Sequence, residues 1–139
     1  MRVVLDTSVL VAAARSRRGA SHELLSQLPD IRFQPVISVP LFAEYCGVIL
    51  RPENLLHRSP AQAEGFLDFL LSVSHLQEIF YQWRPALPDP NDDLILELAI
   101  AAGCRYIVTH NLRHFRGTER WKIAAVTPGE FLKMMRKEK

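Results

Sequence analysis

The chain has 139 residues, which is about the size of one domain. It carries 17 Lys and Arg residues against 15 Asp and Glu residues, a formal net charge of +2, and 48% of its residues are hydrophobic. This composition excludes a disordered chain, and the charge excludes a strongly basic nucleic-acid clamp while allowing a local basic patch. We expect a single globular domain over residues 1–139.

Cysteines and apolar runs indicate the cellular compartment of such a chain. Cys46 and Cys104 are far apart and have apolar neighbours, so we expect two buried, reduced thiols rather than a disulfide. Asp6 interrupts the first apolar run before a signal-peptide core could form. No apolar stretch approaches the roughly 20 residues of a membrane helix. The expected location is the cytoplasm, without a membrane partner.

In the first half of the chain, the sequence predicts short strands that alternate with helices. Residues 3–5 are apolar and are followed by the polar turn Asp6-Thr7-Ser8, which predicts a buried strand. Pro40 suits the first turn of a helix, and Pro52 ends that helix. The expected elements are a strand over 3–5, helices over 8–14 and 21–28, a strand over 36–38 and a helix over 40–50.

The second half continues this alternation. Ser59 and Gln62 have the spacing of a capping box with Pro60 at the first helical position, and Thr127 with Glu130 forms a second box. The expected elements are a helix over 60–73, a strand over 76–80, a helix over 89–102, strands over 105–109 and 123–126, and a C-terminal helix. This pattern predicts an α/β layer fold with a parallel sheet.

Acidic residues stand where such a fold forms its sites, beyond the carboxyl ends of strands. Asp6 follows the first strand, and Glu44 lies among apolar neighbours, where a buried carboxylate needs a partner. Four more acids crowd the helix that starts near residue 89: Asp89, Asp92, Asp93 and Glu97. Taken one by one, Asp6 and the acids at the helix start are also explained as helix caps or by the helix dipole.

Gathered together, these acids would need a cation. Two carboxylates about 4 Å apart repel by roughly 4 kcal/mol at an effective dielectric constant of 20. Oxygen ligands around a small cavity suit Mg²⁺ or Mn²⁺ rather than zinc. Such an ion can activate water and stabilise the leaving oxygen in a phosphodiester displacement. The sequence therefore indicates metal-dependent phosphodiester chemistry as one function of the acids.

Four segments of the chain resemble the motifs of PIN-domain ribonucleases, in the order that the family has them. The segments are residues 3–10, 38–45, 89–99 and 106–111. The likeness is greatest to the toxin components of toxin–antitoxin systems, the relatives of the VapC toxins, and it extends from Val3 to Phe131. It implies a PIN-like three-layer fold, in which helices flank a central parallel sheet, and a Mg²⁺- or Mn²⁺-dependent endoribonuclease.

The same resemblance implies roles for individual residues. The catalytic acids would be Asp6, Glu44 and Asp92, and the metal ligands would be Asp6, Asp92, Asp93 and Asn111. Supporting positions would be Thr7, Ser8, Asp89, Glu97 and Thr109. Asn111 stands where many members carry a fourth aspartate, so we expect one tightly bound ion and a weaker second one. The implied partners are an RNA substrate, a cognate antitoxin protein and a second copy of the chain.

Basic residues and histidines near these motifs have two interpretations each. Beside an acidic site, four arginines suit a single-stranded RNA backbone, although a solvated surface explains them equally well: Arg15, Arg17, Arg113 and Arg116. His110 and His114 are four residues apart, as zinc ligands on a helix can be. They straddle a turn and have no evident third ligand, so we do not expect a zinc site.

Two other functions compete with the ribonuclease. A phosphatase of the haloacid dehalogenase type also places an aspartate after its first strand, but it needs a second one two residues later, where this chain has Ser8. A catalytically weak or inactive module that binds metal and nucleic acid on the same fold is the stronger alternative, because of Asn111.

Overall fold

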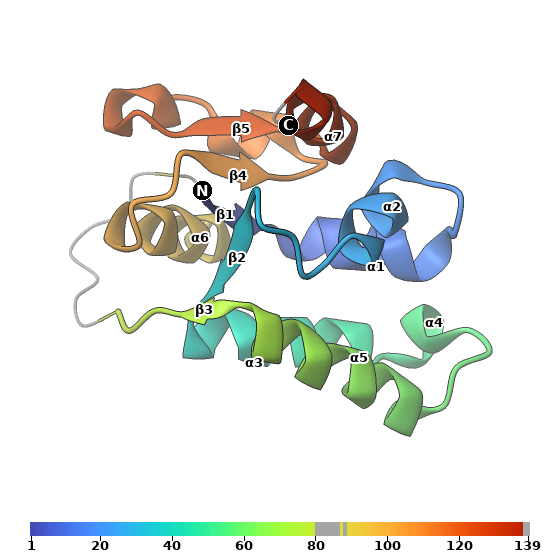
Figure 1. The fold of residues 1–139 in the computed structure, drawn as a ribbon. Helices are drawn as coiled ribbons and strands as arrows, with labels where there is room; N and C mark the ends of the chain where they lie inside the picture. Colours follow the sequence, from blue (N-terminus) through green and yellow to red (C-terminus); the bar gives the residue numbers. More distant parts are fainter. Residues whose placement is uncertain (80–86, 88, 138–139) are drawn as a thin grey trace.

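A parallel five-stranded sheet in the order β3-β2-β1-β4-β5 runs through the protein (Figure 1). The computed structural model describes residues 1–79, 87 and 89–137. The strands are β1 (Arg2–Leu5), β2 (Gln34–Ile37), β3 (His75–Leu76), β4 (Tyr106–Val108) and β5 (Ala124–Val126). The central strands are buried on both faces, as parallel strands between two helical layers must be.

Helices cover both faces of this sheet, and in Figure 1 α6 lies on the opposite side of β1 from α1 and α2. They are α1 (Thr7–Arg15), α2 (Ala20–Ser26), α3 (Val39–Ile49), α4 (Pro52–Leu55), α5 (Pro60–Val73), α6 (Pro90–Ala101) and α7 (Pro128–Lys137). Two 3₁₀ helices, η1 (Leu112–Phe115) and η2 (Thr118–Trp121), connect β4 to β5. The predicted α/β fold with a parallel sheet flanked by helices is confirmed. None of the helices in the described part of the chain is long and apolar enough to cross a membrane.

Side chains start several helices where the sequence predicted it. Both capping boxes form: Gln62 N donates to Ser59 Oγ over 3.1 Å, and Glu130 N donates to Thr127 Oγ1 over 3.1 Å. Ser38 caps α3 by accepting from Leu41 N over 3.2 Å. These caps satisfy backbone N–H groups that the first turn of a helix leaves without partners.

Some expectations were wrong in detail. The strand predicted over 76–80 consists of His75 and Leu76, with 77–79 outside it and residue 80 outside the described residues. This strand pairs only with the end of β2, through Val36 and Ile37, so its length is set by that neighbour. The helix predicted over 8–14 is one residue longer at each end, so Arg15 lies in α1. Both cysteines are free, but Cys46 is only half-buried.

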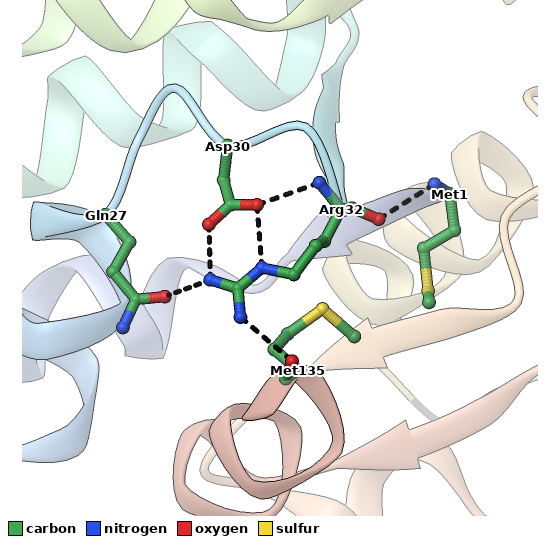
Figure 2. A network of polar contacts seen from close by, with 5 residues as sticks. All are labelled: Met1, Gln27, Asp30, Arg32 and Met135. Atoms are coloured by element: carbon green, nitrogen blue, oxygen red, sulfur yellow. Dashed lines mark hydrogen bonds and ion pairs between the residues drawn. The ribbon is translucent and has the colours of Figure 1, made fainter. Parts of the chain in front are cut away.

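A polar network ties the start of β2 to the end of α7 (Figure 2). Arg32 pairs with Asp30 through Nη2 at 2.5 Å and donates from Nη1 to the Met135 carbonyl over 2.8 Å. Its own carbonyl accepts from the Met1 ammonium over 3.0 Å. Next to Arg32 in the chain, Phe33 packs its ring edge to face against that of Phe131, with centroids 5.0 Å apart. The C-terminal helix is therefore fastened to the sheet by both polar and apolar contacts.

The position of β1 in the sheet creates the crevice where a site is expected. The chain leaves β1 through α1 to reach β2 on one side, while β4 pairs with β1 on the other side. In parallel α/β sheets, such a reversal of strand order opens a crevice beyond the carboxyl ends of the two strands. Here those ends carry Asp6 and Thr109.

Candidate active site

Asp6 is held in this crevice by both its backbone and its side chain. Its N–H donates to the Val108 carbonyl over 2.9 Å, which continues the β1–β4 pairing. Its Oδ2 accepts from Ser8 Oγ over 2.8 Å and from Thr109 Oγ1 over 2.7 Å. Asp6 is the residue before α1, but its side chain does not cap that helix. The helix-cap explanation of Asp6 is therefore wrong, and Oδ1 accepts no hydrogen bond from the described residues.

The turn after β4 is fastened to the turn after β1. Thr109 is fully buried, and its Oγ1 also accepts from Asn111 N over 2.9 Å. His110 N donates to Ser8 Oγ over 3.1 Å, and the His110 ring lies 2.7 Å from Ser21 Oγ. Thr109 and Ser8, both predicted as supporting residues, thus orient Asp6. Asn111 itself is exposed beside them.

Glu44 reaches the same crevice from α3. Its Oε2 accepts a hydrogen bond from Thr7 Oγ1, which is the partner that a half-buried carboxylate needs. The next residue, Tyr45, is fully buried and donates its hydroxyl to the Leu5 carbonyl at the end of β1. Burial raises the Tyr45 pKa well above its usual value, and the charges of Asp6 and Glu44 raise it further. The Tyr45 anchor fixes α3 against β1 and so places Glu44 close to Asp6.

Asp92 completes the group from the first turn of α6. Burial raises its pKa to about 6; the charge of Asp89 also raises it, and Asp6 and Glu44 contribute in the same direction. His114 acts against this shift, with Nδ1 lying 3.3 Å from Asp92 Oδ2. Because the charges of Asp6 and Glu44 both raise the Asp92 pKa, the three predicted catalytic acids are close enough to interact electrostatically.

The other acids of this helix have different surroundings. Asp93 Oδ1 accepts from Leu87 N over 2.8 Å, and Asp89 is exposed and caps α6 by accepting from Asn91 N over 2.9 Å. Burial raises the pKa of Glu97, as does the charge of Asp93, and Glu97 Oε2 is buried with no hydrogen bond to the residues that the structure describes. The helix-cap explanation holds for Asp89. A metal role for Asp93 stays a prediction.

His114 is the contact that sequence reasoning missed. It was considered as a zinc partner of His110 and as one of the basic residues after the last motif, but not as a contact of Asp92. The His114 ring lies against Asp92, and the His110 ring lies against Ser21. η1 turns His114 towards α6, and the buried Phe115 anchors that turn in the core. Only two residues lie between Asn111 and His114, too few for a periodic pattern to reveal a contact with a helix.

The four predicted RNA-binding arginines fall into two places. Arg113 and Arg116 are exposed on either side of His114. Arg15 lies at the far end of α1, where its guanidinium donates to Asn54 Oδ1 over 3.1 and 2.9 Å. Because a helix rises by about 1.5 Å per residue, Arg15 is about 13 Å from Asp6 along the helix axis. Arg17, next to it, lines a cavity of about 640 Å³ with residues of α1, α2 and α5, which none of the three catalytic acids lines. The structure thus places only Arg113 and Arg116 next to His114, the residue that contacts Asp92.

The chemistry of this site fits a hard divalent cation. Asp6 and Asp92 supply carboxylate oxygens, and burial, followed by the charge of Asp89 and with a smaller contribution from Asp6, raises the Asp92 pKa. Within the described ranges, no three His, Cys, Asp or Glu side chains close around one point. Mg²⁺ is commonly held by one or two carboxylates and keeps several waters, so an open carboxylate pair is compatible with it.

Comparison with known proteins gives one positive result. The family model of the PIN domain matches residues 2–113, which include β1 to β4 and every acid of the candidate site. None of the curated proteins matches the chain. Since the match covers well over half of the sequence, the chain belongs to the PIN domain family.

Proposed function

We propose that this protein is an endoribonuclease that depends on Mg²⁺ or Mn²⁺ and acts as the toxin of a type II toxin–antitoxin pair. PIN domains are generally nucleases that act on nucleic acid and use divalent metals, so the chain is a member of a nuclease superfamily. The observation that carries the proposal is the grouping of Asp6, Glu44 and Asp92 beyond the end of β1. RNA as the substrate and the toxin role rest on the sequence resemblance.

Each of these side chains has a task in the proposed reaction. Asp6 and Asp92 would hold the ion, which when bound supplies the positive charge that activates water and stabilises a leaving oxygen. Ser8 and Thr109 keep the Asp6 carboxylate in one orientation, which a site of this kind needs. Glu44, oriented by Thr7, presents a carboxylate that accepts a proton from the attacking water.

Binding of RNA would use the basic residues next to the acids. Arg113 and Arg116 are exposed beside His114, and they place positive charge where the backbone of a single strand would approach Asp92. A cognate antitoxin and a second copy of the chain are the protein partners included in the proposal.

Cleavage of a mixed RNA pool by the purified protein tests this function. We expect cleavage with Mn²⁺ or Mg²⁺, none with EDTA and none with Asp6→Asn. Asp68→Asn is a matched control because Asp68 is an exposed acid on α5, and it should cleave like the wild type. Undiminished cleavage by Asp6→Asn removes Asp6 from the mechanism.

Absence of cleavage by a folded protein that binds metal would favour the binding module instead. Asn111→Asp then tests whether a fourth carboxylate restores turnover. For the toxin role, induced expression of the wild type should arrest bacterial growth, and expression of Asp6→Asn should not. Growth that continues with an active wild-type enzyme contradicts the toxin role alone.

A further inference from the structure

An imidazole lies against the site without a hydrogen bond. Nδ1 of His114 is 3.3 Å from Asp92 Oδ2, yet the ring forms no hydrogen bond to Asp92 or to any other residue that the structure describes. The Asp92 side chain is 11% exposed and that of His114 is 53% exposed. His114 therefore lies between the buried Asp92 carboxylate and the solvent. Nδ1 of His114 and Oδ2 of Asp92 are thus two atoms that can ligate a metal ion, and they face the same space.

The backbone around His114 makes this position well defined. His114 N donates to the Asn111 carbonyl over 3.0 Å, and Asn111 N donates to Thr109 Oγ1 over 2.9 Å. Thr109 in turn donates to Asp6, and the neighbouring Phe115 is buried in the core. The backbone that carries the imidazole is therefore linked to Asp6 through a short chain of hydrogen bonds, and the residue does not sit on a free loop.

The spacing of the two donor atoms suits adjacent positions around one ion. Two ligands at right angles, each about 2.1 Å from an octahedral ion, are about 3 Å apart. The distance of 3.3 Å between Nδ1 and Oδ2 is close to that value. Since no third His, Cys, Asp or Glu of the described residues closes on this point, waters would fill the remaining positions, and Asp6 would reach the same ion through one of them.

We propose that His114 Nδ1 is a direct ligand of the divalent ion together with Asp92 and that it makes the site prefer Mn²⁺ to Mg²⁺. This inference rests on the proposed function, because it concerns the same ion. An imidazole nitrogen is a poor ligand for Mg²⁺, which favours oxygen, and a better one for transition metals. A site with carboxylate oxygens only would lack this preference.

Pulsed electron paramagnetic resonance of bound Mn²⁺ tests the ligand directly. The wild type should show nitrogen modulation from a coordinated imidazole, and His114→Ala should lose it together with Mn²⁺ affinity by at least about 10-fold. Mg²⁺ affinity, measured by calorimetry, should fall by a smaller factor. His114→Asp should bind Mn²⁺ without nitrogen modulation and bind Mg²⁺ more tightly than His114→Ala does.

His57→Ala is the matched control, since His57 is an exposed histidine beside Arg17, away from the acids. It should keep the wild-type spectrum. Nitrogen modulation that persists in His114→Ala, or a wild type that binds Mn²⁺ without it, overturns the ligand while leaving the nuclease proposal intact. A wild type that binds neither ion overturns both proposals. Modulation that disappears with His114 in a protein that cleaves no RNA supports the ligand and contradicts the nuclease.

Discussion

Thr109 and Asp6 lie 103 residues apart in the chain, and Thr109 Oγ1 donates a 2.7 Å hydrogen bond to Asp6 Oδ2. This contact joins the residues that follow two adjacent parallel strands, β4 and β1. The same hydroxyl oxygen accepts from Asn111 N, at the start of the turn that carries His114. The buried Thr109 side chain therefore orients the Asp6 carboxylate and also holds the turn that carries His114.

Thr109→Val removes this hydroxyl and keeps the shape of the side chain. We expect the free energy of unfolding to fall by about 1–2 kcal/mol, because a carboxylate oxygen and a backbone N–H lose a partner. Affinity for Mn²⁺ should fall as well, since Asp6 is no longer held. Urea unfolding and calorimetry measure these changes. Thr109→Ser keeps the hydroxyl and should lie closer to the wild type; equal losses in both variants would assign the effect to packing.

Asp92→Asn should stabilise the metal-free protein at neutral pH. The pKa of Asp92 is raised to about 6, so the folded chain binds this proton more tightly than the unfolded chain does. Stability therefore falls as the pH rises from about 4 to 6, and the variant escapes this loss. We expect a gain on the order of 2 kcal/mol at pH 7.5, shrinking towards pH 4.

Urea unfolding in EDTA across this pH range measures the gain, with Asp68→Asn as the surface control. Addition of Mg²⁺ should stabilise the wild type more than Asp92→Asn, because only the wild type has the full ligand set. A variant that is less stable than the wild type at pH 7.5 would show that Asp92 has a stabilising partner at that pH.

Arg113 and Arg116 should contribute more to RNA binding than Arg15 and Arg17 do. Only the first pair lies beside His114, whereas Arg15 is held by Asn54 at the far end of α1. For single strands, each phosphate contact adds about 0.7 to the slope of log affinity against log salt. Anisotropy of a labelled RNA with Asp6→Asn protein gives this slope for each double alanine variant. A larger loss with Arg15 and Arg17 would place the RNA along the other end of α1.

Arg32→Lys should weaken the attachment of α7. The guanidinium contacts Asp30, Gln27 and the Met135 carbonyl at once, and an ammonium cannot reproduce this fork (Figure 2). The hydrogen bond from Arg32 lowers the Asp30 pKa, so this carboxylate stabilises the fold above its usual pKa and loses that effect as the pH falls. The variant should unfold at lower urea, with the Asp30 pKa, followed by NMR, moving up. An unchanged Asp30 pKa would contradict the assigned pairing.

Elements with strong local signals were predictable from the sequence. The helix over Pro60–Val73 was recognised from a capping box, and β1 from an apolar run that ends in polar residues. β3 was predicted too long because its extent depends on Val36 and Ile37, its pairing partners 39 positions earlier in the chain. The four-residue helix α4 and the 3₁₀ helices are too short to show a hydrophobic period.

In the candidate site too, residues with a local sequence signal were predictable, and contacts that depend on tertiary packing were not. Asp6 could be placed because a strand end in a parallel sheet defines a location. The contact between His114 and Asp92 could not, because it depends on how η1 packs through Phe115 against the core. Arg15 and Arg17 are close to Asp6 in sequence, but a straight helix carries them away from it.

Buried apolar residues that follow the matched region determine how much of the chain is needed for folding. Phe115, Phe131, Leu132 and Met135 are 1%, 0%, 4% and 1% exposed, although the family match ends at residue 113. A fragment cut at that point would retain Asp6, Glu44 and Asp92 but lose Phe131, against which Phe33 packs, and the second half of η1 with the buried Phe115. The matched span is thus shorter than the span that packs into one core, and a shortened version of the protein would have to keep residues 114–137.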